Sequence, residues 1–369
     1  MAVNFRVLYD GKYFVEDIVK SAQWSGDVAQ PHRTLTLALS NTINGTDQAM
    51  RFELGKELRF YVENGGLFRG VIFSYSVAQD GNATVTAYDE NVYLTKNEDS
   101  RRFVGMTAAG IIKEIAKAHA IPVGTIAGTG YVIPKLILRD MTLWDMAVTA
   151  LTETRKQNGR KFFLYASEGK LNLREKKDGT VRWLLEDGVN IITANRSRSI
   201  EEMRTSVKVL GGDEEKKPLS ASAKDVALTS KYGLMQHVER ADSRLNQSQI
   251  QQLAKQRLKE LGKVTEEVTV EALGNTNVIA GAAVYAFESM TELVGGFYVN
   301  ADTHTFENGV HRMSVTLSKT DDLPKLEYED PDAFEAAKKA KVAAKKKAKK
   351  TKEKAKKTTT KKKPSTTKK

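Results

Sequence analysis

Residues 295–318 read GGFYVNADTHTFENGVHRMSVTLS, and their pattern decides the fold class of the chain. Apolar and polar side chains alternate on both sides of Asn308-Gly309, as they do in strands that bury one face. An Asn-Gly pair between two alternating runs is the strongest short-range signal of a β-hairpin. The stretch therefore predicts two long antiparallel strands, and it indicates a chain rich in β-sheet.

The turn also predicts which side chains share a face of this hairpin. A two-residue loop places Phe306 opposite His311, and it places His304 opposite Met313. Two histidines on one face make a metal site conceivable, but a zinc site needs a third ligand that the sequence does not identify. We therefore predict that these four residues form the hairpin core or a subunit contact, without a metal. The opposite face carries Thr303, Thr305, Glu307, Arg312 and Ser314.

The spacing of glycines indicates that this β unit has an earlier copy in the chain. Gly55 and Gly70 are 15 residues apart, and Gly281 and Gly296 are separated by the same interval. After each pair comes a long alternating run, a turn that ends in glycine and a returning run. The spacing predicts two copies of one sheet module, with a chance match between β segments as the alternative.

Periodicity divides the first half of the chain into two regions. Residues 1–97 consist of short alternating runs separated by Gly, Asn and Asp, which predicts an antiparallel β domain. Residues 98–190 contain two runs with helical spacing, for which Thr107 and Thr142 are suitable N-caps, followed by two short strands. This second region is predicted to be a small α+β domain.

The β pattern returns in residues 191–325 and is interrupted by one helix at about residues 247–261. The polar stretch GGDEEKKPLSAS, residues 211–222, reads as an exposed loop. Residues 326–369 form a lysine-rich segment that is expected to be mobile and largely disordered. The predicted class is α+β, mainly β, with two β domains on either side of a small α/β insertion.

The net charge of +12 arises entirely in the last part of the chain. Residues 338–369 contain 17 Lys and one Glu, so residues 1–337 carry a formal charge of −4. Such a segment is expected to bind an acidic partner, which is DNA, an acidic protein, or an anionic envelope polymer or lipid surface. A solubilising tail without a partner is the alternative. The densest lysines, taken as candidate contacts, are Lys345, Lys346, Lys347, Lys349 and Lys350.

Motifs for catalysis or cofactor binding are absent from the sequence. The chain has no cysteine, no GxSxG elbow and no HExxH helix, and its glycines near residue 128 lack a following GK[ST]. We predict no catalytic residue, no cofactor and no enzyme activity. No long apolar run is present, so we expect a soluble protein that is first found in the cytoplasm.

Several dispersed segments resemble one known family. AYDENVYLTKNEDSRRF (Ala87–Phe103), TALTETRKQNGRKFFLYASEGKLNLR (Thr149–Arg174), SIEEMRTSVKVLG (Ser199–Gly211) and residues 295–318 are similar to XkdQ/YqbQ-type baseplate hub proteins. These are grouped with the late-control-D and tail-hub proteins of contractile phages, phage-like bacteriocins and related injection systems. The resemblance covers about residues 1–320 and leaves the lysine-rich tail unexplained.

The resemblance implies a homotrimer with two tail-tube-like β domains and a smaller insertion between them. Such a hub joins the sixfold tail tube to the threefold spike, contacts the tape measure and other baseplate proteins, and forms part of the passage for DNA or ions. It is found at the tail tip of a virion or bacteriocin particle and is assembled in the host bacterial cytoplasm.

Some members of this family carry a C-terminal peptidoglycan hydrolase, whereas this chain has a lysine-rich segment there. The difference argues against an enzymatic role. A cell-wall-degrading hydrolase and a protein that binds nucleic acid through its tail are the alternative functions.

Overall fold

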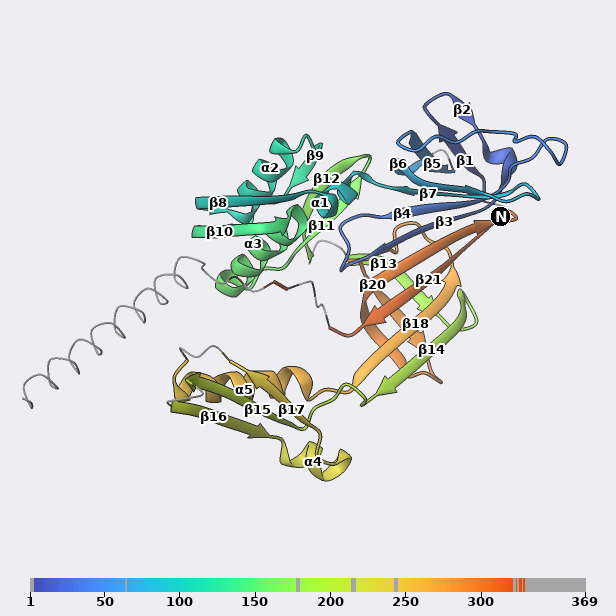
Figure 1. Ribbon diagram of the computed structural model, residues 1–369. Helices are drawn as coiled ribbons and strands as arrows, with labels where there is room; N and C mark the ends of the chain where they lie inside the picture. Colours follow the sequence, from blue (N-terminus) through green and yellow to red (C-terminus); the bar gives the residue numbers. More distant parts are fainter. Residues whose placement is uncertain are drawn as a thin grey trace, which may run out of the picture. The chain divides into compact units, whose positions relative to one another are not determined.

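The computed structural model describes residues 3–63, 65–176, 180–213, 217–241 and 245–320, together with residues 323, 325, 326 and 328. Antiparallel strands predominate over helices (Figure 1), which confirms the predicted mainly β, α+β class. The chain forms two compact units: one contains Lys20–Asp27 and Thr180–Asp321, and the other contains Phe5–Val19 and Val28–Gly179. No helix in the described part of the chain is long and apolar enough to cross a membrane.

The unit with residues 28–179 begins with an antiparallel sheet in the order β4-β7-β6-β5-β1-β2. Alternating leucines on β4 and alternating Leu58 and Phe60 on β5 are fully buried, which explains why these runs form strands with one core face. The strands and the short helix are β1 (Phe5–Tyr9), β2 (Tyr13–Phe14), η1 (Glu16–Ile18), β4 (Thr34–Ser40), β5 (Glu57–Val62), β6 (Gly65–Val77) and β7 (Asn82–Tyr88).

The α+β part follows in the same unit. Thr107 and Thr142 cap its two main helices by accepting hydrogen bonds from Gly110 N and Asp145 N, both at 3.1 Å, as the sequence predicts. The elements are η2 (Glu90–Val92), α1 (Tyr93–Lys96), β8 (Glu98–Thr107), α2 (Ala108–Ala118), β9 (Val123–Ile126), β10 (Val132–Thr142), α3 (Leu143–Asn158), β11 (Phe162–Ser167) and β12 (Lys170–Glu175). Strands β8 and β10 pair with each other, and β11-β12-β9 form a second small sheet.

The other unit contains the second β module. Its main sheet has the order β14-β18-β21-β20-β3, and β19 pairs with β20 on one side and, in parallel, with β13 on the other. The strands are β3 (Val19–Asp27), β13 (Thr180–Glu186), β14 (Ile191–Ser199), β18 (Thr265–Leu273), β19 (Ala283–Glu288), β20 (Leu293–Glu307) and β21 (Val310–Ser318). Alternating apolar residues of β18, β19, β20 and β21 form one core.

A small α/β insertion lies between β14 and β18. It consists of β15 (Ser206–Asp213), β16 (Lys217–Lys224), α4 (Val226–Tyr232), β17 (Gln236–Arg240) and α5 (Gln247–Leu261). The predicted helix at 247–261 is confirmed, but the predicted loop at 211–222 is wrong. Most of that polar stretch continues β15 and β16, because Ala221 and Ala223 alternate with serines and pack under α5.

The structure confirms two copies of one sheet module, but the predicted match of Gly70 with Gly296 is wrong, because Gly70 lies opposite Leu58 whereas Phe297 lies opposite the matching Val284. Strands β5-β6-β7-β4 are paired in the same order as β19-β20-β21-β18. Gly55 and Gly281 both have a positive φ, +83° and +85°, which explains why glycine occupies these positions. Their N–H groups donate to the equivalent carbonyls of Ile72 and Val299, both at 2.9 Å.

A β-bulge marks the same position in both modules. The register with β7 shifts between Ile72 and Ser74, and the register with β21 shifts between Val299 and Ala301. Bulges re-aim a strand and are retained as designed features. The two modules are therefore copies of one β unit, while the domain limits 1–97, 98–190, 191–325 and 326–369 stay predictions.

Candidate functional site

A seam between β3 and β20 joins the N-terminal segment to the second β module. The pairing is antiparallel and runs from Ala301 opposite Asp27 to Glu307 opposite Ser21. Local sequence gives no indication of this contact, because the partners of a strand are set by tertiary structure. A tryptophan within the otherwise polar stretch SAQWSGD is consistent with a covered strand, and Trp24 is 4 % exposed in the structure.

The predicted histidine pair lies directly behind this seam. His304 is opposite Met313 and Phe306 is opposite His311, which confirms the register predicted from the Asn308-Gly309 turn. All four side chains are buried, with His304 at 0 % and His311 at 8 % exposure. The structure thus places them in the core of this module.

Hydrogen bonds join the two imidazoles to each other and to the backbone. His304 Nε2 lies 3.1 Å from the carbonyl oxygen of Val278, which only accepts, so Nε2 carries the proton. His304 Nδ1 and His311 Nε2 share a hydrogen bond at 3.0 Å. Asp302 Oδ2 lies 3.4 Å from His304 Nε2, and its Oδ1 accepts from Ala280 N at 2.6 Å.

The surroundings of His311 favour the neutral ring. Burial, with a smaller contribution from the neighbouring His304, lowers the pKa of the His311 imidazole to about 4. The ring stacks on Phe306 with 4.1 Å between centroids, and the His304 ring lies 5.2 Å from that of Trp24. Within the described ranges, no group of three or more His, Cys, Asp or Glu residues is placed to hold a metal ion.

The opposite face of the same strands is polar. Cross-strand neighbours on this face include hydroxyl residues, such as Thr303 beside Ser314 and Ser25, and charged residues, such as Arg312 beside Thr305. Near the β20–β21 turn the face forms a hollow of about 290 Å³. It is lined by Glu271, Thr303, Thr305, Glu307, Asn308, Val310, Arg312, Met313 and Ser314.

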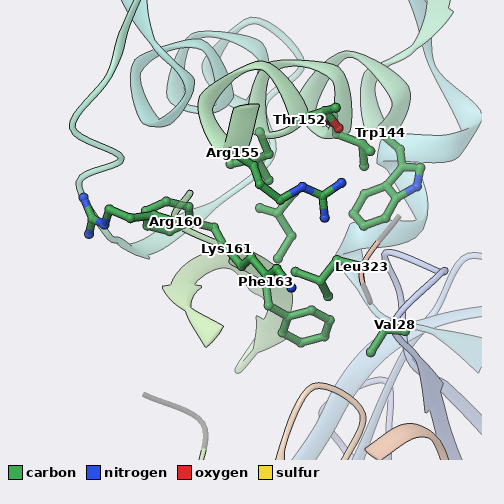
Figure 2. Close-up of a pocket in the computed structure, with 12 residues that line it drawn as sticks. Val28, Trp144, Thr152, Arg155, Arg160, Lys161, Phe163 and Leu323 are labelled. Atoms are coloured by element: carbon green, nitrogen blue, oxygen red, sulfur yellow. Dashed lines mark hydrogen bonds between the residues drawn. The ribbon is translucent and has the colours of Figure 1, made fainter. Parts of the chain in front are cut away.

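A second, smaller cavity lies in the α+β part. Figure 2 shows Arg155 of α3 reaching toward Trp144, Phe163 and Leu323 at its wall. Its volume is about 30 Å³, which is room for one water molecule and far below that of a typical ligand pocket. Beside it, Leu326 N donates to Thr152 Oγ1 at 3.2 Å, which holds Leu326 against this helix.

The structure does not describe the other residues that the sequence predicted as partner contacts. The candidate partner-binding lysines Lys345, Lys346, Lys347, Lys349 and Lys350 lie outside the described residues. Sequence reasoning missed Asp302 and Trp24, which complete the surroundings of His304. Neither residue belongs to a motif, and only the pairing of β3, β20 and β21 brings them together.

Comparisons with known proteins agree with this architecture. The model of the YQBQ-like family matches residues 22–318. The phage-like element PBSX protein XkdQ of Bacillus subtilis (strain 168) is 33% identical over 314 residues, which cover 85% of this chain and 96% of that protein.

Solved structures show the same fold at low identity. A tail protein of prophage MuSo2 from Shewanella oneidensis matches with a TM-score of 0.65 at 12% identity, covering 87% of this chain and 99% of that one. An Escherichia coli component of the type VI secretion system matches with a TM-score of 0.51 at 10% identity, covering 88% and 79%. The chain therefore belongs to the YQBQ-like family and has the fold of a phage tail protein.

Proposed function

We propose that this protein is a non-enzymatic baseplate hub that assembles as a homotrimer and joins a sixfold tail tube to a threefold spike. The duplicated β module carries this proposal. Three chains with two equivalent modules each supply six similar units, so one ring presents near-sixfold symmetry on one side and threefold symmetry on the other. The partners in this role are the tube, spike and tape measure proteins and other baseplate proteins.

The character of the sheet faces supports a passage through the ring. In the second module, the face opposite the core carries rows of short polar side chains across five strands, such as Asn195, Thr269 and Thr316. In the first module, Thr36, Thr86 and Ser74 occupy the equivalent face. In the second module this face also carries Glu271, Glu307 and Arg312, so these charges sum to a net negative value and the wall offers few strong contacts to a polyanion.

The proposal places the protein at the tail tip of a phage or phage-like bacteriocin particle after assembly in the bacterial cytoplasm. The resemblance to a type VI secretion component supports the general class of injection device. No catalytic step is assigned to the chain in this role.

Light scattering on the purified full chain, coupled to size-exclusion chromatography, tests the oligomer. The expected result is a particle with three times the mass of the chain, stable on dilution. Averaged electron images of the assembled tail tip should then show three copies between tube and spike. A chain that remains monomeric at high concentration, or a tip with six copies, would contradict the proposal.

A zymogram distinguishes the alternative of a cell-wall hydrolase. The purified protein is expected to leave a peptidoglycan layer intact. Clearance that co-purifies with the chain would replace the structural role with an enzymatic one.

A further inference from the structure

Several strand edges have no partner among the described residues, and two of them, on β6 and β14, match edges that are paired elsewhere in the chain. Strand β6 pairs with β7 along Ser74–Val77, but β5 pairs with β6 only as far as Val71. The edge of Ser74–Val77 that faces away from β7 is therefore open. Strand β14 pairs with β18 and ends its sheet. Open edges expose backbone N–H and C=O groups that template pairing with another chain.

The β3·β20 seam shows how one such edge is covered within the chain. Residues 301–307 of β20 also extend beyond their pairing with β19, and β3 covers them. In the pairs along this seam, Ala301 lies opposite Asp27 and Thr303 lies opposite Ser25. Because β6 is the copy of β20 in the first module, the β3–β20 pairing shows how a strand would pair with the open edge of β6.

The shared bulge fixes the equivalence of β6 and β20 residue by residue. Ile72 corresponds to Val299, since each accepts the hydrogen bond of the module's glycine and precedes the register shift. Ser74 then corresponds to Ala301, and Val77 corresponds to His304. The open edge of β6 is thus the counterpart of the edge that β3 covers on β20.

Strand β14 is the counterpart of β3. Residues 21–27 read SAQWSGD and residues 193–199 read TANRSRS, with alanine second and serine fifth in both. Each strand precedes the first long strand of its module's hairpin sheet, β4 or β18. In each stretch the alanine is followed two residues later by the side chain that turns inward, Trp24 at 4 % exposure and Arg196, whose side chain is 10 % exposed.

We propose that β14 of a second copy of this chain covers β6 in the same way that β3 covers β20. The pairing is antiparallel and places Ser74 opposite Ser199, Ser76 opposite Ser197, and Val77 opposite Arg196 of the neighbouring copy. Because the two edges differ, the contact is heterologous and continues from copy to copy until a ring closes. This inference rests on the proposed hub function and names the surface that builds its ring.

Disulfide trapping tests the register directly, because the chain has no cysteine. Near the turn the odd-numbered residues of β20, which include Thr303, direct their N–H and C=O groups toward β21. In the β3–β20 pairing, Thr303 and Ser25 therefore lie opposite each other without exchanging backbone hydrogen bonds. Such pairs have Cα atoms about 4.5 Å apart, within the range that a disulfide spans. Ser76 and Ser197 are their counterparts, and both are exposed in the single chain.

The experiment uses the full chain with Ser76→Cys and Ser197→Cys together, under mild oxidation. The expected result on a non-reducing gel is a ladder of covalent oligomers that ends at a closed species, formed by more than half of the protein. The pair Ser25→Cys and Thr303→Cys is the matched control and should cross-link within one chain, without a change of mass. Each single variant should remain uncross-linked.

A shifted pair, Ser76→Cys with Thr193→Cys, distinguishes this register from general proximity. Thr193 is four residues from Ser197, about 13 Å along the strand, and it should give no product. One outcome is an oligomer in light scattering in which the control pair cross-links but residues 76 and 197 do not. That result overturns this pairing and leaves the hub proposal standing. A chain that is monomeric throughout overturns both.

Discussion

The backbone of Gly274 lies against the imidazole ring of His311, so closely that a Cβ on residue 274 would overlap the ring. Gly274 N also donates to the carbonyl oxygen of His311 at 2.9 Å, which holds the end of β18 beside β21. The buried histidine therefore determines the residue type at a position far from it in sequence.

Gly274→Ala should destabilise the protein through this overlap. The added methyl group must displace the His311 ring from its stack on Phe306, and such overpacking costs about 1–3 kcal/mol. Chemical denaturation measures the loss. Gly128→Ala is the control, because nothing lies within 4 Å of its Cβ position, and it should leave the unfolding midpoint unchanged. Equal midpoints for the two variants would contradict the packing described above.

Acidification should weaken the fold through His311. Its pKa is 6.5 in an unfolded chain and about 4 when folded, so between these values the unfolded state binds a proton that the folded state does not. The contribution is complete above pH 6.5 and is lost as the pH falls toward 4, by about 3 kcal/mol in total.

The non-titrating variant His311→Gln tests the assignment. At pH 7.5 the variant should be less stable than the native chain, because it loses the stack on Phe306. As the pH falls from 6.5 to 4.5, the difference in unfolding free energy between the native chain and the variant should become smaller. Parallel pH profiles for the two proteins would exclude His311 as the group that titrates.

Asp302→Ala should cost about 1–3 kcal/mol, because it leaves the buried N–H of Ala280 without its carboxylate acceptor. Asp302→Asn retains an oxygen at that position and should recover most of the loss. Hydrogen exchange of the Ala280 amide is the measurement, and it should become faster in the alanine variant alone. Similar exchange in both variants would show that the carboxylate does not hold this amide.

Thr142→Ala should destabilise the α+β part by about 1 kcal/mol, since the hydroxyl that caps α3 at Asp145 N is removed. Thr142→Ser keeps the hydroxyl and serves as the control. Unfolding followed by the fluorescence of Trp144, which lies in the first turn of α3, reports the change. A serine variant as unstable as the alanine variant would assign the effect to the lost methyl group instead.

Deletion of residues 338–369 should abolish binding to polyanions. It changes the formal charge from +12 to −4, and the removed lysines release counterions when they bind double-stranded DNA. The affinity of the full chain should fall steeply with salt concentration in a fluorescence-polarisation titration. Replacing Lys345, Lys346, Lys347, Lys349 and Lys350 by Gln should reduce the slope; salt-insensitive binding by the truncated chain would contradict a tail-based contact.

Local features of this chain could be predicted from the sequence with good accuracy. The Asn308-Gly309 turn fixed the register of β20 and β21, and the caps Thr107 and Thr142 fixed where two helices begin. Gly55 and Gly281 revealed the repeat, because both occupy a backbone conformation that other residues rarely adopt. The equal interval to Gly70 and Gly296 is a coincidence, since these two glycines are one residue out of register. Turns, caps and positive φ angles depend on a few neighbouring residues, so they can be recognised in the local sequence.

Strands β8 and β10 could not be predicted in this way. β8 reads EDSRRFVGMT and buries only Phe103, so it shows no clean alternation. It forms a strand because β10 pairs along its length. The predicted loop at 211–222 failed for a related reason, since the contact with α5 decides which small residues of β16 are buried.

The sequence by itself determined the β-rich class, the two module copies, the starts of α2 and α3, the position of α5 and the common face of His304 and His311. Only the tertiary structure decided that β3 pairs with β20, that Asp302 and Trp24 surround His304, and which edges remain open. The physical reason is the separation in sequence between the residues that interact. A backbone edge offers the same N–H and C=O groups whatever its side chains are, so its partner is selected by the packing of segments far apart in the chain.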